Sequence, residues 1–144
     1  MKVPTGMATV AAAALTSVSL FGAPMAGAEP ALQSFTSPSG NVACLSAEDS
    51  VRCDIRDRSW APPPRPADCP SQTGYGQGIA LRTSGKPQFV CAGDTTFGAA
   101  GRVLQYGERA VRMGYSCTSE PTGVTCRNGS GNGFTISREA YRLF

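Results

Sequence analysis

Short runs of β-branched, aromatic and aliphatic residues, separated by clusters of glycine, proline, serine and aspartate, recur from about residue 35 to the end of the chain. This pattern is typical of strands of roughly four to eight residues joined by tight turns. No segment of this part repeats its apolar residues with the period of a helix. The pattern therefore predicts an all-β fold, a small antiparallel sheet, sandwich or barrel built from short hairpins.

Three hairpins are expected, each made of two apolar runs around a polar or glycine-containing turn. They pair residues 41–45 with 51–55, 79–83 with 88–92, and 115–118 with 124–127. Residues 134–137 add a closing strand. Residues 103–106 form a further apolar run, for which the sequence does not indicate a pairing strand. Ser137 is expected to cap a final helical turn over 138–140. The proline-rich residues 61–66 form a stiff, extended connector, because proline fixes φ and has no backbone donor.

The first 28 residues differ in character from the rest. Lys2 precedes an apolar run from Met7 to Phe21, and the small residues Ala26-Gly27-Ala28 follow, which is the order of a secretory signal. The run is shorter than the roughly 20 apolar residues that a membrane span needs. We therefore expect a cleavable signal peptide over 1–28, a short linker over 29–34 and a disulfide-stabilised β domain over 35–144, with no membrane span after cleavage.

Six cysteines follow the expected cleavage point, and an even number in a small exported chain is typical of a disulfide framework. In two expected hairpins, the arms carry one cysteine each with the same spacing of eight intervening residues. Cysteines facing each other across antiparallel strands lie within disulfide reach. Six cysteines allow 15 connectivities, and the spacing favours one of them. This connectivity is Cys44–Cys53, Cys117–Cys126 and, by exclusion, Cys69–Cys91.

Several short motifs carry a further signal. They are Phe35 to Cys44 (FTSPSGNVAC), Cys53 to Ile55, Phe89 to Thr95 (FVCAGDT), Leu104 to Gly107, Gly123 to Asn128 (GVTCRN) and Gly131 to Phe134. Together they resemble a family of small exported actinobacterial proteins with a cysteine-rich domain of unknown function. The resemblance runs from about Phe35 to Phe144, with Asn132 where the family often has histidine. It implies an exported, disulfide-bonded domain and supplies no activity.

Composition removes several kinds of chemistry. The chain contains no histidine, so it has neither Ser-His-Asp nor Cys-His catalysis and lacks the commonest zinc ligand. Cysteines held in disulfides do not serve as nucleophiles or as thiolate ligands for zinc. A net charge of +3 is too balanced for a nucleic-acid protein, which presents a strongly basic face. We therefore assign no catalytic residue, no metal, no cofactor and no nucleic-acid partner.

Four residues are candidate ligand contacts: Trp60, Tyr75, Asp94 and Tyr106. Aromatic residues in or next to loops serve as binding anchors on a rigid frame, and Asp94 places a carboxylate in a glycine turn just after Cys91. Each residue also has a purely structural interpretation. The aromatic residues would then pack in the core, and Asp94 would bond to its own backbone in a turn.

These patterns favour a secreted or envelope-associated domain that acts without catalysis, as an interaction or ligand-binding module for an unknown extracellular or envelope partner. The oligomeric state is open. One alternative is an acid-residue hydrolase acting on cell-wall glycans, because folding could bring two of the scattered carboxylates to the separation that glycosidases use. Another is a secreted inhibitor, which would need a rigid, protruding loop between Cys53 and Cys69.

Overall fold

The computed structural model describes residues 34–99 and 101–144, together with Lys2. Within these ranges the chain forms eleven strands and no helix. The strands are β1 (Ser34–Thr36), β2 (Val42–Ser46), β3 (Ser50–Ile55), β4 (Tyr75–Arg82), β5 (Gln88–Cys91), β6 (Arg102–Val103), β7 (Arg109–Arg112), β8 (Tyr115–Glu120), β9 (Gly123–Asn128), β10 (Gly133–Ile136) and β11 (Tyr141–Leu143). The all-β prediction is confirmed.

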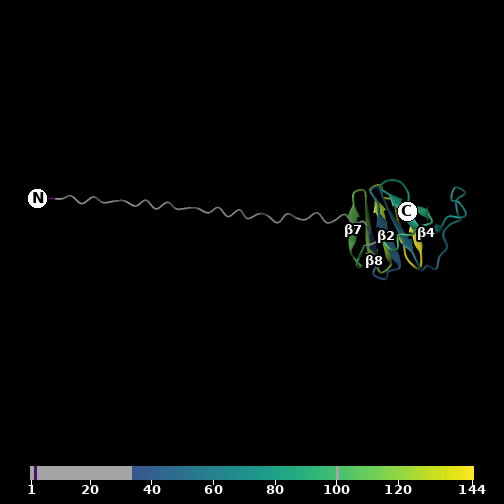
Figure 1. Cartoon of the computed structure of the whole chain (residues 1–144), viewed down its shortest axis with the longest axis horizontal. Helices are drawn as coiled ribbons and strands as arrows, with labels where there is room; N and C mark the ends of the chain where they lie inside the picture. Colours follow the sequence, from purple (N-terminus) through teal and green to yellow (C-terminus); the bar gives the residue numbers. More distant parts are fainter. Residues whose placement is uncertain (1, 3–33, 100) are drawn as a thin grey trace.

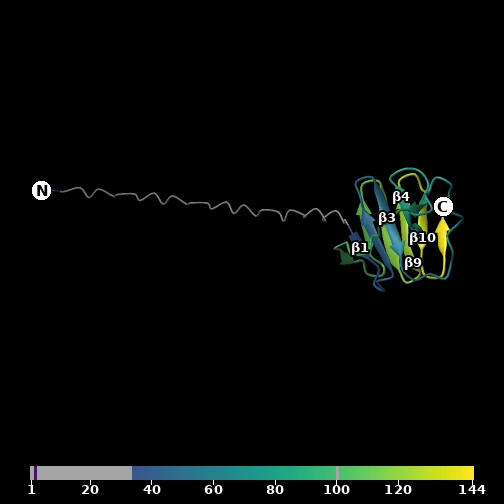
Figure 2. The ribbon, with the colours of Figure 1, turned by 45° about the vertical axis from the view of Figure 1, so that its right-hand side comes forward.

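The strands form two sheets. One has the order β5-β4-β3-β2-β1-β6 and the other the order β11-β10-β9-β8-β7. All pairings are antiparallel except that of β1 with β6, which is parallel. Strand β4 of the first sheet packs against β9 and β10 of the second, and Figures 1 and 2 show the two sheets lying face to face. The architecture is therefore a β-sandwich.

Alternating side chains of both sheets fill the space between them. On β3, Val51 and Cys53 are buried, and on β9, Val124 and Cys126 are buried, as the two-residue period of a strand requires. Both sets belong to one hydrophobic cluster. The Sγ atoms of Cys53 and Cys126 lie 3.9 Å apart. The disulfides of the two sheets therefore contact each other at the centre of the core.

The predicted disulfide connectivity is confirmed in full, with bonds Cys44–Cys53, Cys69–Cys91 and Cys117–Cys126. The first and third join residues directly opposite in their hairpins. The three predicted hairpins are present as β2–β3, β4–β5 and β8–β9. The predicted strand over 134–137 is present as β10, but it does not close the fold, because β11 follows it and pairs with it at the edge of the sheet. Of the run 103–106, only Val103 lies in a strand, β6, which pairs with β1.

The predicted helical turn over 138–140 is wrong. Ser137 N donates to the carbonyl of Ala140 at 2.9 Å, which closes a tight turn from β10 into β11. The segment continues as a strand because β11 pairs with β10 and because the Tyr141 ring packs against Trp60. Ser137 does bond to Ala140, as a cap would, but the bond closes a hairpin.

The expected signal peptide, 1–28, and the linker up to residue 33 lie outside the described residues, apart from Lys2. The described β structure begins at Ser34. In the part of the chain that the structure describes, no helix has the length and apolar character needed to cross a membrane.

Candidate functional site

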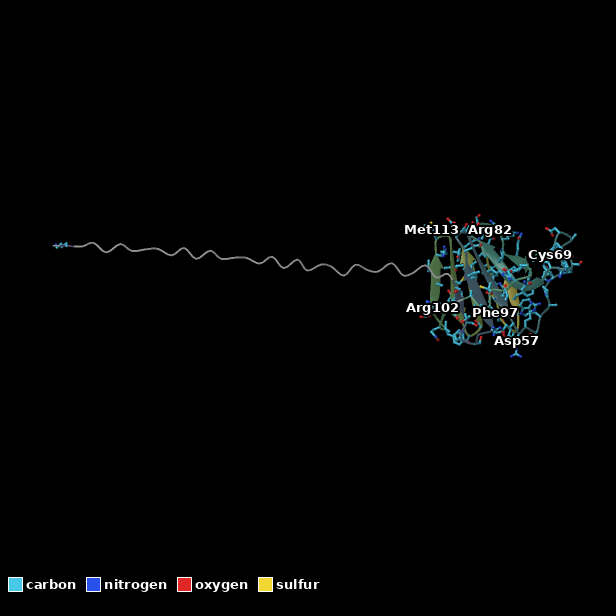
Figure 3. All side chains as sticks on the ribbon, viewed as in Figure 1. Asp57, Cys69, Arg82, Phe97, Arg102 and Met113 are labelled. Atoms are coloured by element: carbon cyan, nitrogen blue, oxygen red, sulfur yellow. A yellow bond between two sulfur atoms is a disulfide. The ribbon has the colours of Figure 1, made fainter. Side chains whose placement is uncertain are left out.

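The long connection between β3 and β4, residues 56–74, is the most prominent irregular segment, and we call it the strap. Figure 1 shows it projecting beyond the sheets next to β4, and Figure 3 places Cys69 on its outer part. The strap contains the proline-rich residues 61–66. A disulfide joins Cys69 to Cys91 of β5, the outermost strand of its sheet. The sequence-based expectation of a stiff connector thus corresponds to a loop tethered to a sheet edge.

Arg65 fixes the shape of the outer strap. Its Nη1 donates to the carbonyl oxygens of Pro70 at 2.7 Å and Thr73 at 2.8 Å, and lies 3.2 Å from Cys69 Sγ. The guanidinium carbon is 5.4 Å from the centroid of the Tyr75 ring, within range of a cation–π contact. One cationic side chain therefore links the strap turn, the disulfide and β4.

The inner part of the strap packs against the start of β4. Gly76 has φ +76°, and a Cβ at this position would lie 2.5 Å from Pro62 Cγ, so only glycine fits without displacement. Arg58 donates to the carbonyl of Gly76. These contacts explain why β4 is irregular between Tyr75 and Ile79, where its register with β5 shifts.

A cavity of about 490 Å³ lies between the strap and β5. We call it the strap groove. Its walls are three strap prolines, the Cys69–Cys91 pair, the polar residues Asp68 and Gln88, and the aromatic residues Tyr75 and Phe89. This volume falls in the range of roughly 300–1,000 Å³ that is usual for ligand sites, and the walls present both apolar and polar groups.

Trp60 and Phe89 form an aromatic cluster with Tyr141 behind this groove. The Phe89 ring centroid lies 4.9 Å from that of Tyr141 and 6.2 Å from that of Trp60. Trp60 Nε1 donates to the carbonyl of Ser137 at 2.8 Å. Because Phe89 lies on β5 and Tyr141 on β11, the cluster closes the side of the sandwich between the two outermost strands. Tyr75 touches the same cluster through Phe89, with centroids 6.4 Å apart.

Asp94 lies elsewhere and forms an ion pair. Its Oδ1 accepts from Arg52 Nη1 at 2.7 Å, and its side chain is 79% exposed. The hydrogen bond and the positive charge of Arg52 lower the pKa of the Asp94 carboxyl. Asp94 lines neither the strap groove nor the polar pocket described next. Its contacts fasten the loop after β5 to the outer face of β3.

Tyr106 lines a second concavity, of about 320 Å³, which we call the polar pocket. The turns after β1, β3, β8 and β10 meet there and supply hydroxyl, amide and charged groups. Three of the lining residues are acidic and exposed, Asp57, Glu120 and Glu139, and Arg138 lies among them. Figure 3 places Asp57 at the end of the sandwich opposite Arg82 and Met113.

The structure thus brings two of the four candidates, Trp60 and Tyr75, to one region and leaves Asp94 and Tyr106 at separate places. Phe89 and Tyr141 join that region without having been singled out in the sequence. The position of Phe89 two residues before Cys91 was a usable signal, because a strand places such residues on one face. The acidic residues of the polar pocket come from three separate segments, the turn after β3, the end of β8 and the turn after β10, so no local motif marks them.

The chain matches, over residues 14–144, the family of unknown function DUF6636. The chain belongs to this family. The match covers every strand of the sandwich, and it confirms the expected domain of unknown function, while actinobacterial origin stays an expectation. No curated protein and no solved structure matches the chain. The three disulfides of this DUF6636 domain indicate an oxidising or extracellular environment.

Proposed function

We propose that this DUF6636 protein is an exported, non-catalytic binding module that holds a short extended peptide in the strap groove. The observation that carries the proposal is the cavity of about 490 Å³ between a cross-linked proline strap and the outermost strand of a sheet. A strap fixed by a disulfide and by Arg65 provides a surface that needs little ordering on binding, which favours affinity.

An extended peptide suits this groove because of β5. In the described part of the chain, β5 pairs with β4 alone, so its second edge carries backbone groups without a strand partner. An added strand gains main-chain hydrogen bonds from such an edge, and pockets beside the edge select alternate side chains. The proline and aromatic walls accept apolar side chains. The exposed carboxylate of Asp68 at the groove favours a peptide with a basic residue.

Among the four candidate residues, we assign direct peptide contact to Tyr75. Trp60 supports Phe89 from behind, through the aromatic cluster. Tyr106 would contact a ligand only in the polar pocket, and Asp94 would contact none in either cavity.

Selection from a displayed library of random peptides tests the proposal, with protein purified after expression of the full chain. We expect enriched peptides to combine apolar residues with a basic one. Tyr75→Ala should weaken binding at least tenfold, or about 1.4 kcal/mol, and Tyr106→Ala serves as the matched control because it alters an exposed aromatic residue of the other cavity. Absence of enrichment, or a larger effect of Tyr106→Ala, would contradict the proposal.

A hydrolase acting on cell-wall glycans is the second candidate, and the polar pocket supports it. Three acidic residues line one concavity there, and a pair of carboxyl groups is the minimum that glycoside hydrolysis requires. The test is release of reducing ends from purified cell-wall glycan by the wild-type protein and by Asp57→Asn, Glu120→Gln and Glu139→Gln. Activity lost in at least one variant, and kept in Tyr75→Ala, would favour the enzyme over the binding module.

The inhibitor alternative, which needs a rigid, protruding loop between Cys53 and Cys69, is supported by the projecting strap and by its disulfide to β5. An inhibitor would insert the strap into a protease and slow its turnover of a standard substrate. Titration of common serine and cysteine proteases with the purified protein tests this alternative. Inhibition at an equimolar ratio would favour the inhibitor, because it requires the strap itself to contact the protease, which peptide binding in the groove does not.

A further inference from the structure

We propose that the Cys69–Cys91 disulfide is a site of thiol–disulfide exchange with a dithiol reductant, and that its opening releases the strap. The proposal concerns the chemistry of the bond and stands apart from the peptide-binding function proposed above.

The Cys69–Cys91 disulfide is more accessible to solvent than the other two disulfides. Cys91 is exposed, and both Cys69 and Cys91 line the strap groove. The four remaining cysteines are 0–1% exposed, and the two disulfides that they form contact each other inside the core. Exchange requires a thiolate to reach a sulfur atom. A reductant therefore meets the Cys69–Cys91 bond first, at the Cys91 sulfur.

The positive charge of Arg65 also favours exchange at the Cys69–Cys91 bond. Arg65 Nη1 lies 3.2 Å from Cys69 Sγ, and a neighbouring guanidinium stabilises a thiolate. When attack occurs at the Cys91 sulfur, Cys69 is the leaving group, and a leaving thiol of lower pKa departs faster. The exposed residue Cys91 and the Arg65 guanidinium beside Cys69 thus favour attack in one direction, at Cys91 with Cys69 as the leaving group.

The step balances as a two-electron exchange. One thiolate of the dithiol attacks Cys91 Sγ, the Sγ–Sγ bond breaks, and Cys69 departs as a thiolate that takes up a proton from water. The second thiolate of the reductant then attacks the reductant's own sulfur in the mixed disulfide and releases the thiolate of Cys91, which is protonated in turn. The protein gains two thiols, and the reductant becomes a disulfide.

Opening this bond removes the one covalent tie between the outer strap, residues 63–70, and β5. In the described chain, residues 63–70 make one hydrogen bond outside the strap, which Tyr75 Oη donates to the Pro64 carbonyl at 3.4 Å, and Arg65 adds its contact with the Tyr75 ring. The bonds of Arg65 to Pro70 and Thr73 lie within the strap itself. The two core disulfides remain, so the sandwich stays folded while the strap moves away from β5.

Timed reduction with dithiothreitol, quenched by iodoacetamide and followed by peptide mass spectrometry, tests the selectivity. We expect alkylation of Cys69 and Cys91 at least tenfold faster than that of the other four cysteines. Arg65→Met should slow the opening at least threefold and Arg65→Lys should retain the wild-type rate. Equal labelling of all six cysteines would overturn the proposal, and an unchanged rate in Arg65→Met would remove Arg65 from it.

Cleavage by endoproteinase Asp-N before Asp68 tests strap release. We expect selective reduction to accelerate this cut at least tenfold and to leave strand segments intact. Cys69→Ser together with Cys91→Ser, which cannot form the bond, should be cut as fast as the reduced wild type. If the oxidised and the reduced proteins are cut equally fast, the disulfide does not control the strap. Peptide binding enters neither measurement, so this result is independent of the function proposed above.

Discussion

Asp54 of β3 is a buried carboxylate whose removal should have a large, calculable effect. Its side chain is 1% exposed, and its oxygens accept from Arg52 Nε and Nη2, both at 2.8 Å. Asp54 Oδ2 also accepts from the backbone N–H of Thr96 at 3.0 Å. The same Arg52 binds Asp94. Asp54 and Asp94 thus share one cation but differ in burial, which makes them a matched pair.

The expected magnitudes follow from that difference. Asp54→Ala leaves the buried Thr96 N–H without its acceptor, which costs about 1–3 kcal/mol, and it also removes charge-assisted bonds. Breaking a fully buried ion pair costs roughly 3–5 kcal/mol. Arg52 is 19% exposed and keeps its ion pair with Asp94, so the loss of unfolding free energy should lie near the lower end of that range. We expect a loss of about 3 kcal/mol. Asp94→Ala breaks an exposed pair that solvent screens, so it should lower the free energy of unfolding much less than Asp54→Ala.

Urea unfolding at neutral pH with the disulfides intact, followed by circular dichroism, measures both free energies of unfolding. The double variant completes a cycle that isolates the coupling between the two carboxylates. Equal losses for Asp54→Ala and Asp94→Ala, or a larger loss for Asp94→Ala, would refute the reasoning from burial.

Three further outcomes are expected. Asn128→Ala should lower the free energy of unfolding by about 3 kcal/mol in the same assay, because this buried amide donates to two carbonyls at the end of β4 and in the following turn and accepts from two backbone N–H groups. Gly78→Ala should lower the free energy of unfolding by about 1–3 kcal/mol, because the new Cβ would overlap Asp54 Oδ1 of β3. Gly93→Ala is the control, because its Cβ meets open space and the melting temperature should stay nearly unchanged. Hydrogen bonds lower the pKa values of Asp94 and Glu108 in the folded protein below their ordinary values of 3.8 and 4.5. The two carboxylates therefore stabilise the fold fully above those ordinary values, and this stabilisation is lost as the pH falls through the lower pKa values of the folded state. Thermal melting from pH 6 to pH 2 should therefore decline less steeply below pH 5 in Asp94→Asn with Glu108→Gln, and an identical slope would contradict the assignment.

The parts of the fold that local sequence controls were predictable. The hairpins of β2–β3 and β8–β9 each place two cysteines at directly opposed positions, so spacing alone indicated both disulfides. The parallel pairing of β1 with β6 joins segments far apart in the chain, and two short strands carry no signal of it. The turn at Ser137 was mistaken for a helix end because a serine cap looks the same in both settings until the pairing of β11 decides between them.

The candidate site also has a part that the local sequence indicates and a part that only the assembled fold shows. Aromatic residues beside proline-rich and glycine-rich segments pointed to Trp60 and Tyr75, which do lie together at the strap. Phe89 contacts both of them and Tyr141 contacts Trp60 and Phe89. Phe89 and Tyr141 come from two different sheets, so only the packing of the sandwich reveals the cluster. The groove itself depends on a disulfide and on the position of β5 at the edge of its sheet, and both are properties of the assembled fold.

The most direct test of the binding account is chemical-shift mapping of the isotope-labelled protein with the tightest peptide selected from the library. We expect the largest changes at Tyr75, at residues 88–91 of β5 and at the non-proline strap residues, with little change around Tyr106. Largest changes at the polar pocket, or changes that form no continuous surface along the strap groove, would contradict the account.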